Sequence, residues 1–258
     1  MTTPPFEDGF DGPDLDTRVW LPHYLPHWSS RADSAAAYEV SGSCLRLRLP
    51  EHHPLWCPAD HPPLRVSGIQ SGVFAGPVGS TVGQQPVRPG AVVREAQVPH
   101  AGWTPRYGSL EMRARAVLTP RSMVAWWLIG LEDRPERCAE LCVMEVFGDA
   151  VEPGRSAAVG MGTHPFRDPR VVEDFAAPRL ELDVAEFHTY AVDWRPDGAV
   201  FLVDGEPVRS VAATPDYPMQ SMLAVFDFPE KAAAGEPYTE PQLVVDHVRG
   251  PASAGPWA

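Results

Sequence analysis

Residues 187–208 read FHTYAVDWRPDGAVFLVDGEPV and carry the clearest structural pattern in the chain. Two runs rich in aromatic and β-branched residues are separated by Asp197-Gly198, and Asp204-Gly205 follows the second run. An Asp-Gly pair between such runs is a strong hairpin signal, because a tight hairpin turn needs residues that tolerate left-handed backbone angles. We therefore predict two antiparallel strands joined at Asp197-Gly198, with a second turn at Asp204-Gly205.

Alternation with a period of two recurs elsewhere in the chain. Leucine alternates with arginine in residues 42–49 (GSCLRLRL), and apolar residues alternate with charged ones in residues 107–117 (YGSLEMRARAV). This pattern predicts half-buried antiparallel strands. Residues 123–130 (MVAWWLIG) and 141–147 (LCVMEVF) are apolar on nearly both faces, which predicts central strands of a packed sandwich. Residues 243–248 (LVVDHV) predict a last strand.

Helical signals are nearly absent. No stretch of about a dozen residues has 3.6-residue periodicity, and the best candidate is a turn or two from Glu230 to Ala234. The 30 prolines and 21 glycines fall between short apolar segments. We predict an all-β fold, a sandwich or a barrel, and disfavour a propeller because no repeat of about 40 residues is visible. A chain of 258 residues fits one domain over residues 1–258.

Long loops are expected from His52 to Trp103, a region rich in proline, glycine and histidine. Loops of this length in a compact domain are usually functional or disordered, and we interpret these as the walls of a cleft.

Charge and composition exclude several classes of partner. The formal net charge is −13, whereas nucleic acids and anionic membranes require a basic face. No apolar run approaches the roughly 20 residues that span a bilayer. The first thirty residues lack a basic start followed by an apolar run, so the chain as written carries no secretion signal and would be cytoplasmic, but its localisation stays unknown. The oligomeric state stays open.

The four cysteines are predicted to be free thiols. Cys44, Cys57, Cys138 and Cys142 form no C-x-x-C pair, which disfavours a zinc site. If Cys138 and Cys142 lie on one extended strand, their Cα atoms are roughly 13 Å apart, beyond the reach of a disulfide.

The candidate chemistry lies in residues 139–148 (AELCVMEVFG). On a regular strand Glu140 and Cys142 share a face, and Glu145, five residues after Glu140, points to the opposite one. A single β-bulge between Cys142 and Glu145 restores the parity and turns both carboxylates into one cleft. Two solvated glutamates on an edge strand are the simpler alternative. We favour a functional pair because burying carboxylates among apolar residues is costly.

Such a pair predicts a retaining glycosidase. The carboxyl groups would lie roughly 5 to 5.5 Å apart, so that one attacks the sugar while the other protonates the departing oxygen. We expect Glu140 to be the nucleophile, kept ionised by a polar setting. Glu145 would be the general acid and then the base, its pKa raised by apolar neighbours such as Met144 and Phe147.

These segments, in this order, resemble glycoside hydrolase family 16, which contains laminarinases, lichenases and related β-glucanases and galactanases. ELCVMEVFG is similar to the family's E-x-D-x-x-E signature at both glutamates. YGSLEMRARA, AWWLIG, FHTYAVDWRPDGAVFLVDG and LVVDHVRG resemble other segments of that family. The resemblance implies a concanavalin-type β-jelly-roll sandwich with a concave cleft. It also implies endo-acting cleavage of a β-linked polysaccharide or oligosaccharide through a glycosyl-enzyme at Glu140, with no cofactor required.

One residue departs from the signature. Cys142 stands where the family has an aspartate that bridges the two glutamates and helps to set their protonation. A thiol is only a weak hydrogen-bond donor with an ordinary pKa of about 8.5. The alternative function is therefore a catalytically degenerate glycan-binding protein on the same fold.

The resemblance also implies substrate contacts. His164 falls where the family often has a histidine beside the acid/base, and an ordinary loop histidine is the alternative. Trp127, rather than its neighbour Trp126, is expected to face the cleft and stack on a sugar ring, with core packing as the alternative. Trp103 is a further stacking candidate.

A structural calcium ion is possible, since Asp246 resembles a calcium-ligating carboxylate of many relatives, acting with backbone oxygens near Gly42. Calcium takes about six to eight oxygens, and we can name few of them, so an ordinary exposed aspartate is the alternative.

Overall fold

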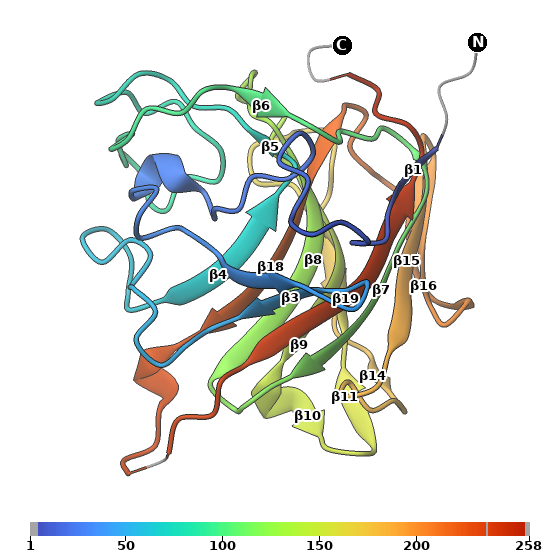
Figure 1. The fold of residues 1–258 in the computed structure, drawn as a ribbon. Coiled ribbons are helices and arrows are strands. Elements are labelled where there is room, and N and C mark those ends of the chain that lie inside the picture. Colours follow the sequence, from blue (N-terminus) through green and yellow to red (C-terminus); the bar gives the residue numbers. More distant parts are fainter. Residues whose placement is uncertain (1–4, 236, 256–258) are drawn as a thin grey trace.

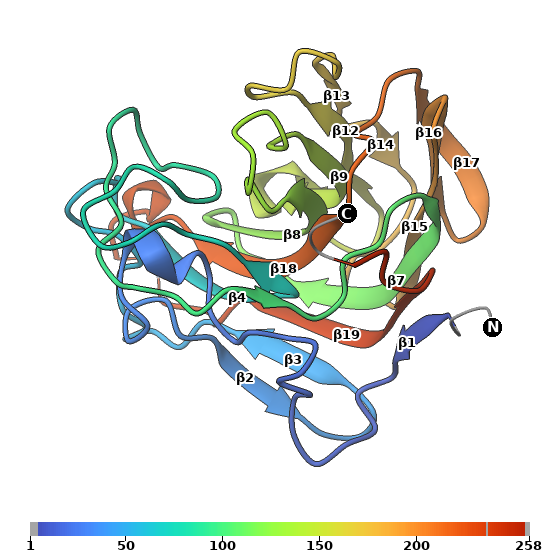
Figure 2. The same cartoon turned by 90° about the horizontal axis from the view of Figure 1, so that it is seen from above.

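The computed structural model describes residues 5–235 and 237–255, and within them two antiparallel sheets pack face to face. The eight-stranded sheet has the order β17-β16-β15-β7-β19-β3-β2, and β1 also pairs with β19. The six-stranded sheet has the order β13-β12-β9-β8-β18-β4. The two sheets form nested, curved layers (Figure 1, Figure 2). The prediction of an all-β sandwich is confirmed, and no described helix is long and apolar enough to span a membrane.

The strands of the larger sheet are β1 (Phe6–Asp8), β2 (Ala37–Val40), β3 (Leu45–Arg48), β7 (Gly108–Val117), β15 (His188–Arg195), β16 (Gly198–Val203), β17 (Glu206–Val211) and β19 (Gln242–Gly250). Those of the smaller sheet are β4 (Arg65–Gln70), β8 (Ser122–Gly130), β9 (Glu140–Phe147), β12 (Gly160–His164), β13 (Asp174–Ala176) and β18 (Met219–Asp227). Short strands form two further sheets: β5 (Gly72–Val73) with β6 (His100–Ala101), and β10 (Val151–Glu152), β11 (Ser156–Ala158) and β14 (Arg179–Leu180). Three 3-10 turns are η1 (Pro26–Trp28), η2 (Gly148–Ala150) and η3 (Pro229–Lys231).

The predicted hairpin is confirmed at both turns. β15 pairs with β16 in unbroken register across Asp197-Gly198, and β16 pairs with β17 across Asp204-Gly205. Asp204 has a φ of 51° and Gly205 a φ of 82°, the left-handed angles that such a turn requires. The carboxylate of Asp204 also accepts a hydrogen bond from the backbone N–H of Thr189 at 2.8 Å, which ties the turn to the neighbouring strand.

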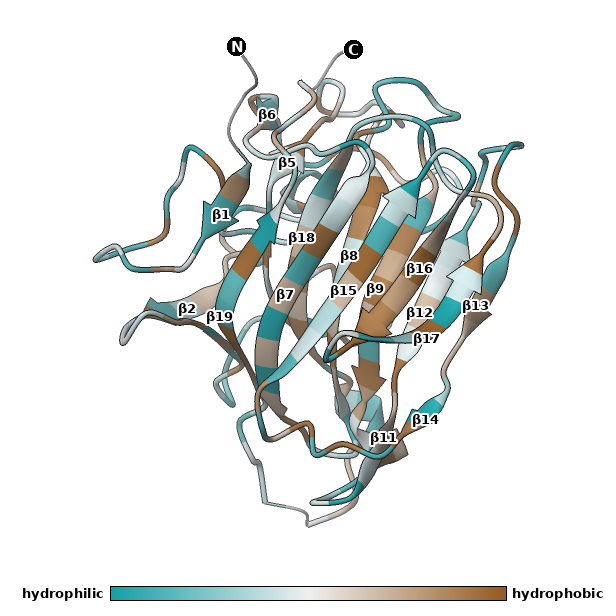
Figure 3. Cartoon of the chain, turned by 90° about the vertical axis from the view of Figure 1, so that its right-hand side faces the viewer, coloured by the Kyte–Doolittle hydropathy of each residue, from teal (hydrophilic) through white to brown (hydrophobic). Residues whose placement is uncertain are grey.

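The main core lies between the two sheets and follows the alternation in the sequence. Leu45 and Leu47 of β3 are fully buried in it, as are Leu110 and Met112 of β7, while the intervening residues face outward. The resulting stripes are visible along β7 in Figure 3. Trp126 points into the same core, where its Nε1 donates to Ser221 Oγ at 3.0 Å. The apolar period of two thus fixes which face of each sheet is internal.

The region from residue 52 to 103 is less irregular than predicted. Beside its loops it contains β4, a nearly fully buried strand at the edge of the six-stranded sheet. This strand was not predicted because the sequence RVSGIQ lacks regular alternation of apolar and polar residues and contains Gly68. A Cβ at Gly68 would lie 3.0 Å from the Cβ of Ala224 and 3.1 Å from the carbonyl oxygen of Leu223, so the glycine permits a close approach to β18.

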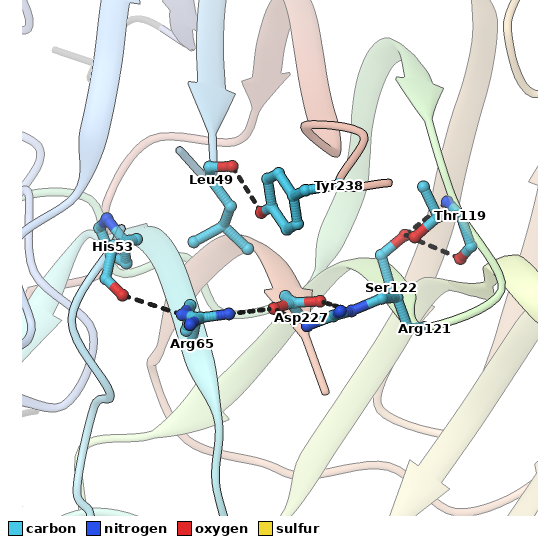
Figure 4. A network of polar contacts seen from close by, with 8 residues as sticks. All are labelled: Leu49, His53, Arg65, Thr119, Arg121, Ser122, Asp227 and Tyr238. Carbon is cyan, nitrogen blue, oxygen red and sulfur yellow. Dashed lines mark hydrogen bonds and ion pairs between the residues drawn. The ribbon is translucent and has the colours of Figure 1, made fainter. Parts of the chain in front are cut away.

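A buried ion-pair cluster holds one end of the six-stranded sheet (Figure 4). Asp227, at the end of β18, is fully buried and contacts Arg65 at 3.0 Å and Arg121 at 2.5 Å. Arg65 begins β4 and Arg121 immediately precedes β8, so the carboxylate joins three adjacent strand ends. The neighbours of Asp227 in sequence, Phe226 and Phe228, line a pocket on the outer face of this sheet.

We expect Asp227→Ala to lower the free energy of unfolding by about 3 kcal/mol, because it leaves two partly buried guanidinium groups without their carboxylate. Urea denaturation followed by tryptophan fluorescence measures this loss. Glu152→Ala is the control, since the ion pairs of Glu152 with Arg155 and Arg179 are exposed, and its loss should cost less than about 1 kcal/mol. Equal destabilisation by both changes would contradict a stabilising role for the cluster.

Candidate active site

The predicted β-bulge is present in β9. Opposite β8, Trp126 pairs with Met144 and Trp127 with Cys142, so Val143 has no partner of its own on β8. The register between β9 and β12 shifts at the same place. Val143 and Met144 both point into the core between the sheets. The bulge therefore reverses the parity of every later residue in the strand.

As a consequence, the two glutamates face the same side of the sheet. Glu140, Cys142 and Glu145 all line one pocket on the outer face of the six-stranded sheet. Trp127 of β8 and Phe226 of β18 contribute its apolar floor. Loops complete the wall with four residues from the first 85: Tyr24, His61, Leu64 and Gln85. The 52–103 region thus contributes part of the cleft wall, as its length predicted.

The pKa of Glu140 differs from the sequence-based expectation, whereas that of Glu145 shifts in the expected direction. Burial, together with the nearby carboxylates of Glu145 and Glu173, raises the pKa of Glu140 to about 8. The prediction of a polar setting that keeps Glu140 ionised is therefore wrong: the pocket is too desolvated. Burial also raises the pKa of Glu145, in the predicted direction, while His164 opposes this shift. Burial therefore favours the protonated form of both carboxyl groups.

Cys142 lies between the two glutamates but does not bridge them. Its Sγ contacts the carbonyl oxygen of Gly160 at 3.9 Å, and within the described residues it makes no hydrogen bond to either carboxylate. Burial and the carboxylates of Glu140 and Glu145 raise the pKa of the thiol well above its ordinary value, so it is neutral at physiological pH. The four cysteines are free, as predicted.

The two candidate tryptophans have different positions. Trp127 lines the pocket, and its Nε1 has no hydrogen-bond partner in the described part of the chain, which leaves a donor beside the cavity. Trp103 is only 1% exposed, stacks on Phe6 at 4.3 Å and donates from Nε1 to the carbonyl oxygen of Pro251. The prediction that Trp103 stacks on a sugar is therefore wrong, because the ring is enclosed in the core between the sheets.

His164 flanks the pocket on β12, where it pairs in register with Glu140. Its Nδ1 lies 2.8 Å from a carboxylate oxygen of Glu173, and its ring stacks on Phe175 at 4.8 Å. These contacts fix the ring beside the two glutamates. A role in orienting the acid/base or the substrate stays a prediction.

The surroundings of Asp246 do not suit a cation. Its carboxylate lies 3.3 Å from Arg113 and 2.9 Å from His247. Among the described residues, no cluster of three or more His, Cys, Asp or Glu side chains could hold a metal ion. Calcium binding at Asp246 stays a prediction without a supporting donor set.

Sequence reasoning missed the aromatic and amide groups that complete the pocket. Tyr24 packs edge-on against Phe226 with ring centroids 5.5 Å apart, and it lies more than a hundred residues from either glutamate in sequence. Gln85 donates from Nε2 to Glu140 Oε2 at 3.2 Å. No motif surrounds either residue, so only the fold reveals them.

Comparison with known proteins gives a consistent picture. Residues 103–234 match the family model described as glycosyl hydrolases family 16. No curated protein sequence matches the chain. An endo-β-galactosidase from Clostridium perfringens that releases GlcNAcα1-4Gal has a similar structure, with a TM-score of 0.79 and 22% identity over 98% of this chain. The chain spans 63% of that protein.

Smaller relatives match over nearly their whole length. The catalytic domain of a laminarinase from Thermotoga petrophila has a TM-score of 0.64 at 14% identity, covering 99% of this chain and 98% of that domain. A Bacillus licheniformis β-glucanase has a TM-score of 0.60 at 15% identity, covering 97% of this chain and 99% of that one. These likenesses show that the sandwich is the jelly roll of these enzymes.

Proposed function

Because the chain belongs to glycosyl hydrolase family 16, we propose that it cleaves internal β-linked bonds of a polysaccharide and retains the configuration at the anomeric carbon. The observation that supports this most directly is the bulge in β9. Because of it, the side chains of Glu140 and Glu145 both point into one pocket, which Trp127 also lines. Retaining glycosidases need two carboxyl groups close enough for one to attack the sugar directly.

In the first step, an oxygen of ionised Glu140 attacks the anomeric carbon while Glu145 gives its proton to the departing glycosidic oxygen. The glycosidic bond breaks, and a glycosyl ester forms at Glu140. In the second step, ionised Glu145 takes a proton from water, and the water oxygen attacks the anomeric carbon and displaces Glu140. Two inversions leave the β configuration unchanged, and both carboxyl groups return to their starting states.

Release of reducing ends from a panel of polymers tests the proposal. The panel contains β-1,3- and mixed-linkage glucans and β-galactans, together with mucin glycans that end in GlcNAcα1-4Gal. The last substrate is included because of the name of the similar Clostridium protein. Proton NMR during turnover shows the anomer formed first. We expect the β anomer. The α anomer as first product would exclude a glycosyl-enzyme at Glu140.

A glycan-binding protein is the second candidate, and one observation favours it. Within the described residues Cys142 makes no hydrogen bond to Glu140, and burial raises the pKa of Glu140, the residue that must be ionised for attack. Isothermal titration with oligosaccharides from the same panel distinguishes the two. Binding without turnover on any polymer would support the binder, because the cleft aromatics act without any proton transfer.

We expect Cys142→Asp to leave kcat/KM unchanged or to raise it by up to about tenfold, because a carboxyl group at this position can hydrogen bond to a neighbouring glutamate as a buried thiol cannot. Initial rates of reducing-end release measure the effect. Cys142→Ser is the control of similar size, expected to stay within about threefold of the original protein. A large drop in the aspartate variant alone would show that the thiol has a role of its own.

A further inference from the structure

Gln85 enters the catalytic pocket from a loop that no sequence motif marks. Its side-chain Nε2 donates to Glu140 Oε2 at 3.2 Å, and its backbone N–H donates to Glu132 Oε1 at 2.7 Å. The Gln85 backbone has a φ of 44°, an angle that non-glycine residues rarely adopt. Left-handed backbone at such a residue costs on the order of 1 kcal/mol and persists only where the surroundings impose it.

The surroundings do impose it. Glu132 is buried, has a φ of 53° and is paired with Arg167, which fixes the acceptor for the Gln85 N–H. The preceding residue, Gln84, is held on both sides: its side chain donates to the carbonyl oxygen of Gly130 at 3.3 Å, and its own carbonyl accepts from Trp28 Nε1 at 2.6 Å. These contacts of Glu132 and Gln84 fix the backbone of Gln85 in the position from which its side chain reaches Glu140.

The amide of Gln85 is poorly satisfied apart from this contact. In the described part of the chain, its buried Oε1 has no hydrogen-bond partner, and its Nε2 bonds only to Glu140. A buried unpaired carbonyl oxygen is unfavourable by roughly 1–3 kcal/mol, so an apolar side chain would serve packing better at this position. Among the described residues, Glu140 is the one hydrogen-bond partner of the Gln85 side chain.

We propose that Gln85 is a positioning residue of the active site, which orients the nucleophile Glu140 and stabilises its ionised form in place of the bridging residue that Cys142 does not supply. This inference rests on the proposed retaining hydrolysis. An NH2 group can only donate to a carboxylate, so the contact favours the arrangement in which Glu140 is ionised and Glu145 carries the shared proton. That arrangement is the one from which attack begins.

Besides Gln85, several titratable groups lie near Glu140 and Glu145 and influence their ionisation. The groups that interact with the pair are Glu145 and Cys142 on the same strand, His164 on β12, Glu173 after it and Tyr24 from the N-terminal loop. Glu145 and Glu173 can carry negative charge, and none of these five groups makes a hydrogen bond to Glu140 within the described residues. In the part of the chain that the structure describes, Gln85 is the side chain that donates a hydrogen bond to the Glu140 carboxylate.

The pH dependence of kcat/KM for Gln85→Met separates a positioning role from a merely structural one. Loss of the donor penalises every state in which Glu140 is ionised, including the state with both glutamates ionised. We therefore expect about a tenfold loss between pH 6 and 7, where the proton sits on Glu140, with KM nearly unchanged. Above about pH 9 both proteins should have the same rate, because there the penalty affects the resting and the reactive states equally.

Gln85→Glu is the isosteric second variant. It places a like charge beside Glu140 and should enlarge the loss at neutral pH. Gln97→Met is the matched control, since Gln97 is a loop glutamine that contacts Arg31 and the backbone of Glu95. Its pH profile should coincide with that of the unmodified protein. A loss in Gln85→Met by one constant factor at every pH would overturn the proposal.

A titration independent of turnover keeps this test separate from that of the hydrolase function. In protein labelled with carboxyl-13C glutamate, the Glu140 signal is identified by its absence in Glu140→Gln. We expect its pKa to rise by about one unit in Gln85→Met. If no substrate is turned over, the proposed function fails, but the titration still decides the role of Gln85. An unshifted Glu140 signal would overturn the positioning role.

Discussion

Replacing Glu140 with glutamine should lower kcat on the preferred polysaccharide by at least about four orders of magnitude, because a neutral amide cannot form the glycosyl ester. The change keeps the size of the side chain, so the fold should be retained. Release of reducing ends measures the loss, and circular dichroism confirms that the variant is folded. Glu136→Gln is the control, since Glu136 is exposed in the loop before β9 and should retain activity within about twofold.

Azide assigns the two roles. In Glu140→Ala, azide can attack directly from the vacated side of the sugar and give an α-glycosyl azide from an activated substrate. In Glu145→Ala, azide attacks the glycosyl-enzyme and gives the β-glycosyl azide. The opposite pair of products would reverse the assignment of nucleophile and acid. Full activity in Glu140→Gln would exclude a covalent intermediate at this residue.

Much of the fold follows from local patterns that tertiary packing reinforces. The Asp-Gly turns of residues 187–208 and the alternation in β3 and β7 each specify which face of a strand is buried, and the structure has them as expected. The bulge was predictable for a physical reason. Two glutamates five residues apart cannot share a face of a regular strand, so a common cleft requires one inserted residue.

The rest depends on contacts between segments distant in sequence. Trp103 looks like a cleft residue because it ends a long loop, yet Phe6 and Pro251, from the two ends of the chain, enclose its ring. Gln85 reaches Glu140 only because Glu132 fixes its backbone. The raised pKa of Glu140 has the same origin, since burial by several loops sets it. One-dimensional patterns carry no information about which loop covers a strand.

The pH dependence of hydrolysis should be a bell whose descending limb lies near pH 8. The reactive form holds one proton on the pair, and that proton is lost when the pH exceeds the pKa of Glu140, which is raised to about 8. The ascending limb should lie above pH 4.5, since burial also raises the pKa of Glu145. Initial rates from pH 4 to 10 at substrate concentrations below KM measure both limbs. A descending limb below pH 6 would contradict the desolvated pocket.

Stability provides a second readout of the same carboxyl group. The folded protein binds the Glu140 proton more tightly than the unfolded chain does, so this group favours folding most below its ordinary pKa of 4.5. The stability contribution declines as the pH rises from 4.5 to about 8 and is constant above that. Glu140→Gln removes the ionisation and should therefore raise the melting temperature at pH 8 but not at pH 4. An equal effect at both pH values would mean that Glu140 ionises freely. Glu140 would then be ionised at neutral pH without a hydrogen bond from Gln85. A rise in melting temperature at pH 8 alone would mean that the ionised Glu140 carboxylate destabilises the fold at the position where the sugar must bind.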